Sequence, residues 1–265
     1  MGTETRTGRI VQHPVVRGIL GAVGVLLALA AWQLGIAWGI LPAEDIPTPA
    51  EVISSLVSQV QTGEFWAAVR ETMQSVVLGL AGGAAIALPL AIAMGQSESV
   101  DHALRPTVEF LRPVPSLALI PFTMLKWGPT QTSVIFLVAF TSIWPLLIQT
   151  LDGIKGLDET AMLTARSLRI GRLARLRWVV IPGTLPYVAT GLRIAASVAL
   201  IVAVSVELIT GAPGLGSAIS DAQNALALEK MYALIMASGL LGIVLYLALT
   251  RVERHLLHWH PGYRP

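Results

Sequence analysis

The stretch VVLGLAGGAAIALPLAIAM, from Val76 to Met94, decides the fold class because it contains no charged residue. A helix needs roughly 20 mostly apolar residues to cross the hydrocarbon core of a membrane. The stretch has no polar face, so it does not match a helix on the surface of a soluble bundle. It predicts a membrane-spanning helix.

Five further stretches complete a predicted set of about six membrane spans. The first of these stretches along the chain, Ile19–Leu41, is longer than the roughly 7–15 apolar residues of a signal peptide and ends without a clear cleavage site. We therefore expect it to be retained as a membrane span. The sequence therefore predicts an all-α, polytopic membrane protein. The five stretches are Ile19–Leu41, Val114–Leu125 extended back across Arg112 to Phe110, Ser133–Leu151, Tyr187–Ile209 and Met231–Leu249.

The composition agrees with a membrane protein. Of the 265 residues, 54% are hydrophobic and 13% are charged, whereas soluble domains carry about 25% charged residues. These values exclude a disordered or collagen-like chain and disfavour a nucleic-acid partner. The chain has no cysteine, which excludes disulfide bonds and thiol catalysis.

The basic residues predict the orientation, because cytoplasmic segments carry an excess of Lys and Arg. If both termini are cytoplasmic, 14 of the 18 basic residues lie inside, and Arg193 lies within a span. The remaining three, Arg70, Lys126 and Lys230, lie outside. We therefore expect the N-terminus and the C-terminus to be cytoplasmic.

The longest predicted cytoplasmic connection, residues 152–185, holds six of the 18 basic residues. Glu159–Leu168 is predicted to form a helix whose acidic start suits the helix dipole. Arg172–Val180 is predicted to form a second helix, which Pro182 and Pro186 end before the fifth span. The residues alone leave two interpretations open. The helix pair lies on anionic lipid headgroups, or it docks in a groove of a cytoplasmic partner.

The predicted external loop, residues 209–230, is rich in glycine. It follows no strand and lacks the GxGxxG pattern, so it does not predict a nucleotide site. We expect a tight turn followed by a short helix around Ser217–Leu228.

Polar residues within the predicted spans are candidates for lining a transport path. Intramembrane charges are costly and face the bundle interior or water, which selects Arg193 and Glu207, with a structural ion pair as the alternative for each. The hydroxyl candidates, which could equally bond a neighbouring carbonyl, are Ser116, Thr123, Ser142 and Ser205. The pairs Gly35/Gly39 and Gly79/Gly83 favour close helix packing.

No catalytic constellation is visible in the sequence. The chain has no P-loop, so we do not expect it to hydrolyse ATP. His255, His258 and His260 cluster near the C-terminus, but the neighbouring Trp259 favours a tail at the membrane surface over a metal site. We expect no catalytic residue, no metal and no cofactor in this chain.

Several motifs together carry a family resemblance from about Arg70 to Tyr263. The chain resembles the inner-membrane permease subunit of bacterial ABC importers, in the branch serving sulfonates, taurine, nitrate and related small solutes. The motifs are LRPVPSLALIP at 111–121, ARSL at 165–168, IPGTLP at 181–186, TGLR at 190–193, VE at 206–207, GLG at 214–216 and WHPGY at 259–263.

The resemblance implies a type I importer fold and a set of partners. It implies that the 152–185 loop is the coupling loop that docks on an ATPase subunit, and that ATP and Mg are bound by that subunit. It further implies a homodimer in the inner membrane, two ATPase subunits and a periplasmic solute-binding protein. Transport would follow by alternating access. The residues expected to dock are Glu159, Ala161, Ala165, Arg166, Leu168, Arg169 and Gly171.

The resemblance also implies a division of the chain into three parts. Residues 1–68 are expected to form the N-terminal tail, the first span and a periplasmic loop. Residues 69–254 form the transporter core, and residues 255–265 form a cytoplasmic tail.

The chain departs from the family motif at two positions in the coupling loop. Leu163 stands where many members carry Glu, and Arg169 stands where the family has Gly. An Arg in the left-handed conformation that such a Gly permits costs about 1–2 kcal/mol. We consider two alternatives: Gly171 displaces the turn, or Arg169 forms a salt bridge with the ATPase.

Two other classes of function compete with an importer permease. A secondary transporter or channel without an ATPase would be expected to carry intramembrane carboxylates for ion coupling, and Glu207 alone qualifies. A membrane-embedded enzyme would require a cluster of nucleophiles or metal ligands within the spans, and the sequence shows none.

Overall fold

The structure is a computed structural model that describes residues 14–42 and 44–257, and this part of the chain is helical throughout. Five of its helices are long and apolar enough to cross a membrane. They are α2 (Pro14–Ala37), α4 (Gly63–Gln96), α7 (Gln131–Lys155), α10 (Ile181–Thr210) and α12 (Leu228–Leu256). These helices confirm five of the predicted spans. Because α4 begins at Gly63, the boundary expected at residue 68 falls inside a helix.

The predicted third span is a bent pair of helices rather than one straight helix. It consists of α5 (Glu98–Leu111), the 3-10 turn η1 (Ser116–Leu119) and α6 (Ile120–Trp127). The chain turns by 81° between the two halves. Pro113 and Pro115 lie in the break, where they supply no backbone donor to a helical ladder, and Pro115 itself is extended, with φ −64° and ψ 120°.

The centre of the bundle is built by α4, α7 and α10, which pack through small residues. A side chain at Gly79 would place its Cβ 2.5 Å from Val138, and one at Gly83 would place it 2.9 Å from the carbonyl oxygen of Ala139. Two backbones therefore approach closely along α4 and α7, as the Gly79/Gly83 pair predicted.

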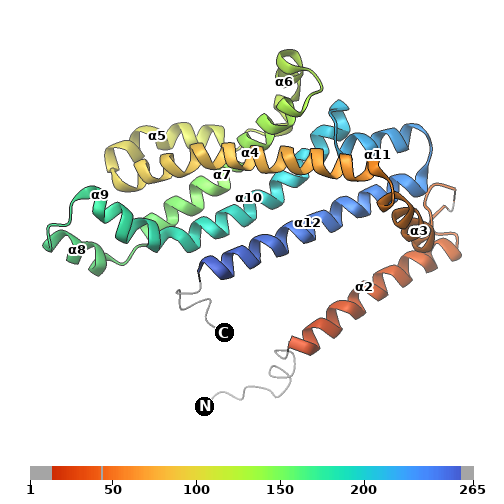
Figure 1. The fold of residues 1–265 in the computed structure, drawn as a ribbon, viewed down its shortest axis with the longest axis horizontal. Helices are drawn as coiled ribbons and strands as arrows, with labels where there is room; N and C mark the ends of the chain where they lie inside the picture. The colour runs from red at the N-terminus through yellow and green to blue at the C-terminus, as the bar shows by residue number, and fades with distance from the viewer. Residues whose placement is uncertain (1–13, 43, 258–265) are drawn as a thin grey trace.

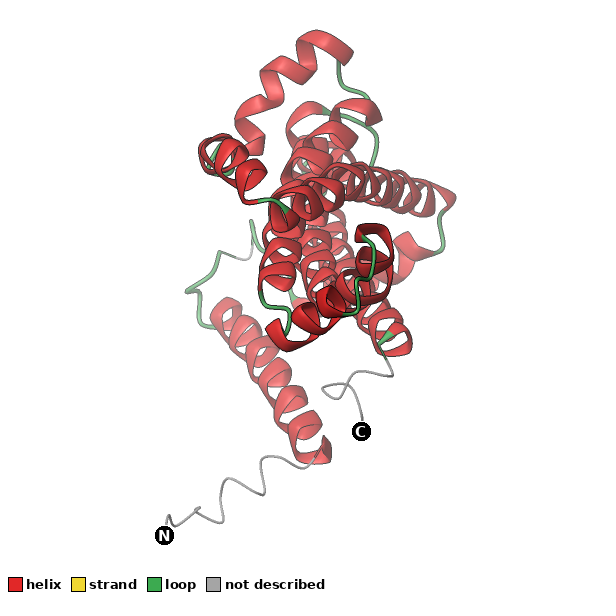
Figure 2. Cartoon of the chain, turned by 90° about the vertical axis from the view of Figure 1, so that its left-hand side faces the viewer, coloured by secondary structure: helices red, strands yellow, loops and turns green. Residues whose placement is uncertain are grey.

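The prediction for Gly35 and Gly39 was wrong. In the described part of the chain α2 stands apart from the bundle (Figures 1 and 2), and a Cβ at Gly35 would meet Leu41 just beyond its own helix. Gly39 instead has φ +69, a left-handed conformation that suits glycine after the helix end. The rings of Trp32 and Tyr232, 6.4 Å apart, connect α2 to α12.

The two ends of the bundle carry different short helices (Figure 1). One end holds α8 (Glu159–Ser167) and α9 (Arg172–Arg175). The opposite end holds α3 (Pro49–Val60) and α11 (Leu215–Asn224). α11 confirms the short helix expected after the turn, although it starts before the expected residue and ends earlier.

The predicted helix break at Pro182 does not occur. A π-helical turn, η2 (Leu176–Val180), joins α9 directly to α10, so the helix runs from Arg172 to Thr210. The amide of Ile181 bonds the carbonyl of Leu176, five residues back, which rearranges the hydrogen-bond ladder just before Pro182. A wide turn of this kind accommodates a proline that would otherwise kink or end a helix.

Candidate functional site

The coupling loop contains the predicted helix, α8. The side chain of Asp158 accepts a hydrogen bond from the amide of Thr160 at 2.8 Å, which caps the start of the helix. At the other end, the amide of Ile170 bonds the carbonyl of Ala165 at 3.0 Å. The helix therefore ends in a tight turn immediately after Ser167.

Arg169 itself adopts the strained conformation in this turn. Its φ is 53°, whereas Gly171 has φ −59°. The alternative in which Gly171 displaces the turn is therefore wrong. The backbone keeps the left-handed shape that the motif glycine permits, with an arginine in that position.

The side chains of α8 divide into exposed and buried groups. Leu163 is 52% exposed and Leu168 is 70% exposed, and the side chains of Glu159 and Arg169 also face outward. Ala165 is 3% exposed, so its methyl group packs inside the loop and is not available to a partner in this structure. The side chains of Ala161 and Arg166 lie outside the described part.

The base of the coupling loop is packed tightly against three spans. A Cβ at Gly153 of α7 would lie 2.7 Å from Tyr187 of α10. A Cβ at Gly95 of α4 would lie 2.6 Å from Ile154, and one at Gly183 would collide with Leu157. Side chains thus fill the positions left open by glycines of α4, α7 and α10 at the base of the loop, so these elements are closely packed there.

Glu207 lies near the C-terminal end of α10 and is completely buried. Its Oε2 accepts hydrogen bonds from the hydroxyl of Thr72 at 2.8 Å and from the amide of Gly216 at 3.0 Å. The hydroxyl of Thr72 in turn accepts from the amide of Leu215 at 2.8 Å. Glu207 therefore joins α4, α10 and the start of α11, an arrangement that favours a structural role.

Arg193 forms an ion pair with Glu253 of α12. Its guanidinium carbon also lies 5.8 Å from the centre of the Tyr246 ring. The charge of Arg193 is thus matched inside the protein, which is the structural alternative that the sequence left open. Its partner is 60 residues away in the chain, and no spacing in the sequence indicated the pair.

The hydroxyl candidates are not brought together. Thr123 on α6 is buried and donates to the carbonyl of Ile120 at 3.0 Å, while Ser116 lies on η1. Ser142 on α7 is buried, and no hydrogen-bond partner is found for its hydroxyl among the described residues. Ser205 lies elsewhere, on α10.

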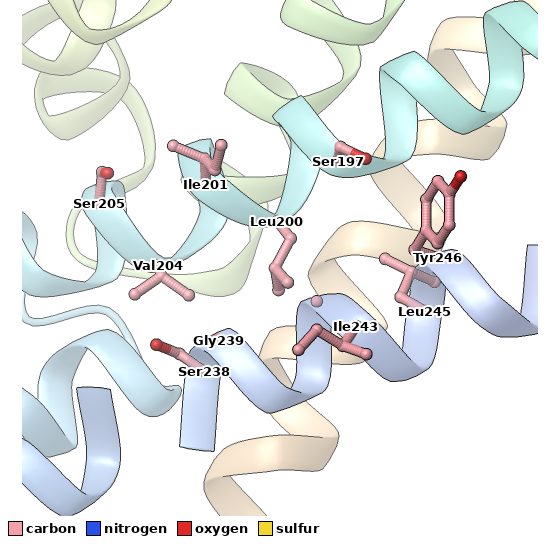
Figure 3. A pocket seen from close by; sticks show the side chains of 11 residues that line it. Ser197, Leu200, Ile201, Val204, Ser205, Ser238, Gly239, Ile243, Leu245 and Tyr246 are labelled. Atoms are coloured by element: carbon pink, nitrogen blue, oxygen red, sulfur yellow. The ribbon is translucent and has the colours of Figure 1, made fainter. Parts of the chain in front are cut away.

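Ser205 lines a groove of about 520 Å³ between α10 and α12 (Figure 3). Ser238 and Tyr246 of α12 share the groove, whose other walls are mostly apolar. These two residues were not among the predicted path residues, although each interrupts the apolar run of the last span with a hydroxyl group.

Of the three histidines near the C-terminus, His258 and His260 lie outside the described residues. Within the described ranges, no group of three or more side chains of the types that bind metals is found.

Residues 83–258 match the family model described as "Binding-protein-dependent transport system inner membrane component". The chain belongs to this family. Its members are permease components of ABC importers in which the ATPase is a separate subunit, so ATP is bound by a partner. This chain is accordingly a multi-pass inner-membrane permease subunit that works with an ATPase and a solute-binding protein.

Two relatives support this membership over nearly the whole chain. The taurine transport system permease protein TauC of Escherichia coli (strain K12) is 30% identical, over 94% of this chain and 93% of the relative. The nitrate import permease protein NrtB of Leptolyngbya laminosa is 30% identical, over 90% of this chain and 87% of the relative.

Solved structures confirm the fold of a binding-protein-dependent permease. An inward-facing structure of the MetNI methionine ABC transporter aligns with a TM-score of 0.66 and 16% identity, over 72% of this chain and 95% of that chain. A bacterial ABC transporter involved in import of the acidic polysaccharide alginate aligns with a TM-score of 0.64 and 14% identity. That alignment covers 95% of this chain and 99% of the other.

Proposed function

We propose that two copies of this permease form the path of an importer for a small solute of the sulfonate, taurine or nitrate kind. Two ATPase subunits dock on the coupling loops, and both chain termini are cytoplasmic. The named relatives support the solute class, since one is a taurine permease, one a nitrate permease and one a putative aliphatic sulfonate permease.

The exposed leucines of α8 and of the turn after it are the observation that carries the docking proposal. Leu163 on α8 and Leu168, the first residue after α8, face outward at the end of the molecule that holds α8 and α9. A helix that presents exposed leucines fits an apolar groove on a partner. The packed base beneath it, at Gly153 and Gly183, couples this helix to the spans.

The proposed mechanism is alternating access driven through α8. Closure of the two ATPase subunits on ATP moves the coupling loops, and because α7 and α10 are packed at the base of the loop, both spans move together. The path then opens outward to accept solute from the binding protein. Hydrolysis and reopening of the ATPases release the solute to the cytoplasm.

Single aspartate substitutions on α8 test the docking. Leu163→Asp and Leu168→Asp each place a charge in the apolar contact, and we expect at least about a tenfold loss of ATPase recovered with the affinity-purified permease. Leu173→Asp is the matched control, because Leu173 is 79% exposed but lies on α9. Normal ATPase recovery with both α8 variants would contradict docking at this helix.

The solute class and the copy number are tested on the assembled complex. The complex is reconstituted with its binding protein, and ATP hydrolysis is measured with taurine, an alkanesulfonate or nitrate. We expect one of these solutes to stimulate hydrolysis and a neutral sugar control not to do so. Stimulation by none of the three would contradict the solute class. Native mass spectrometry of the same sample checks for two permease copies and two ATPase subunits.

A further inference from the structure

An ion pair joins α5 to the beginning of the coupling loop. Nζ of Lys155, the last residue of α7, lies 2.7 Å from Oδ2 of Asp101. Nη2 of Arg105 lies 2.6 Å from the same oxygen. Arg105 belongs to the same helix as Asp101, whereas Lys155 belongs to a different one. The Lys155 contact is therefore a link between elements, and the Arg105 contact is not.

The carboxylate of Asp101 is the shielded partner in this link. Asp101 is 9% exposed, whereas the side chains of Lys155 and Arg105 are 42% and 45% exposed. Exposed ion pairs contribute little because water and salt screen them, but a shielded carboxylate is screened less, so losing one of its two cationic partners weakens the compensation of its charge. Beside the pair, Ile154 fills the hollow at Gly95 where α4 ends, just before α5 begins.

The remaining contacts of α5 described here are apolar. Val100, Leu104 and Val108 pack against a core cluster formed by α4, α7 and α10. Apolar contacts are non-directional, whereas the Lys155–Asp101 pair is a charge-assisted contact between two specific side chains, so it adds a directional link to the packing. Lys155 is thus placed to decide where α5 sits relative to the loop.

We propose that Lys155 is a positioning residue that makes the bent segment of α5 and α6 move together with the coupling loop. α5 leads directly into the 81° break and then into α6, so a pull at Asp101 acts on the whole segment. This proposal rests on the docking of the ATPase at α8. It adds a second route, besides the packed spans, by which ATPase motion reaches the membrane.

Hydrogen–deuterium exchange of the permease–ATPase complex tests the link without knowledge of the solute. Exchange is compared with and without a non-hydrolysable ATP analogue, in peptides covering α8 and in peptides covering residues 98–127. In the parent complex we expect the analogue to change exchange in both regions. Lys155→Met should keep the change at α8 and lose more than half of the change at 98–127.

Two further variants separate the link from a general loss of structure. Lys155→Arg keeps the charge and should retain the parental response. Arg105→Met removes the partner within α5 and should also retain it. The proposal is overturned if Lys155→Met responds like the parent, if Arg105→Met loses the response equally, or if residues 98–127 of the parent do not respond.

Hydrogen–deuterium exchange of the permease without ATPase distinguishes failure of the Lys155–Asp101 link from failure of ATPase docking at α8. Lys155→Met alone should raise deuterium uptake in α5 at least about twofold over the parent, because the link holds α5 whether or not a partner is bound. A parent complex with no response at α8 would contradict the docking. Unchanged uptake in α5 of the isolated variant would contradict the link itself.

Discussion

Arg169 holds a left-handed backbone conformation, with φ 53°, at the end of α8. Such a conformation costs an L-residue roughly 1–2 kcal/mol, and glycine avoids most of this cost at the expense of more freedom when unfolded. We therefore expect Arg169→Gly to stabilise the permease by about 1 kcal/mol. The midpoint of thermal unfolding in detergent should rise. Arg169→Ala is the control, since it removes the charge but keeps the Cβ, and equal stabilisation by alanine would assign the effect to the charge.

At the start of α11, Gly214 lies against the carboxyl group of Glu207 and leaves no room for a side chain. Gly214 has φ +154, and a Cβ there would overlap the carboxyl group of Glu207. We expect Gly214→Ala to destabilise the permease by roughly 1–3 kcal/mol, because the methyl group forces the buried carboxylate away from its partners. Thermal unfolding measures the loss. Gly63→Ala is the control, as no atom lies within 4 Å of the Cβ position, and an equal loss there would contradict the explanation.

At the residue scale, the sequence located the polar candidates but not their partners. The charges at Arg193 and Glu207 were correctly expected to face the protein interior or water. Their partners, Glu253 and Thr72, lie 60 and 135 residues away, and only the packing of the spans brings them together. The burial of Ala165 could not be predicted from the sequence either, because tertiary contacts rather than the sequence pattern set the orientation of a short helix.

The contact between α4 and α7 depends on one face of α4. A Cβ at Gly83 would lie 2.9 Å from the backbone oxygen of Ala139, whereas one at Gly82 would lie 3.6 Å from the Ala139 side chain. We expect Gly83→Ala to separate the helices and destabilise the permease by about 1–3 kcal/mol. Gly82→Ala should be neutral or slightly stabilising, since alanine favours helix. Thermal unfolding of the two variants compares the faces, and equal effects would contradict the close approach.

At the scale of elements, hydropathy was a reliable guide to the long helices and a poor guide to their ends. The run Val76–Met94 marks only the membrane part of α4, which starts at Gly63 because Thr62 caps it in a polar stretch. The prolines around residue 114 indicated that the third span is not a regular straight helix. The size of the bend, 81°, could not be predicted because it depends on how α5 packs on α4 and α7. At Pro182 the π turn overrode the expected break.

At the scale of the whole molecule, the two ends of the bundle differ in chemistry as well as in shape. The end with α8 and α9 carries the arginine-rich coupling loop, and the opposite end carries α3, capped by Thr48 and Glu51, together with α11. A basic end is retained on the cytoplasmic side of a membrane. The coupling loop also has to be cytoplasmic to meet an ATPase, so charge and function demand the same orientation.

Single cysteines test this orientation directly, because the chain has none of its own. Asn224→Cys places an exposed thiol on α11, and Ser167→Cys places one on α8. In intact spheroplasts, a membrane-impermeant maleimide should label Asn224→Cys, while Ser167→Cys should react only after the membrane is permeabilised. Labelling after permeabilisation shows that both thiols are reactive and serves as the control. The reverse pattern would place the coupling loop outside, where no ATP is available to an ATPase docked on α8, and would overturn the orientation and the docking together.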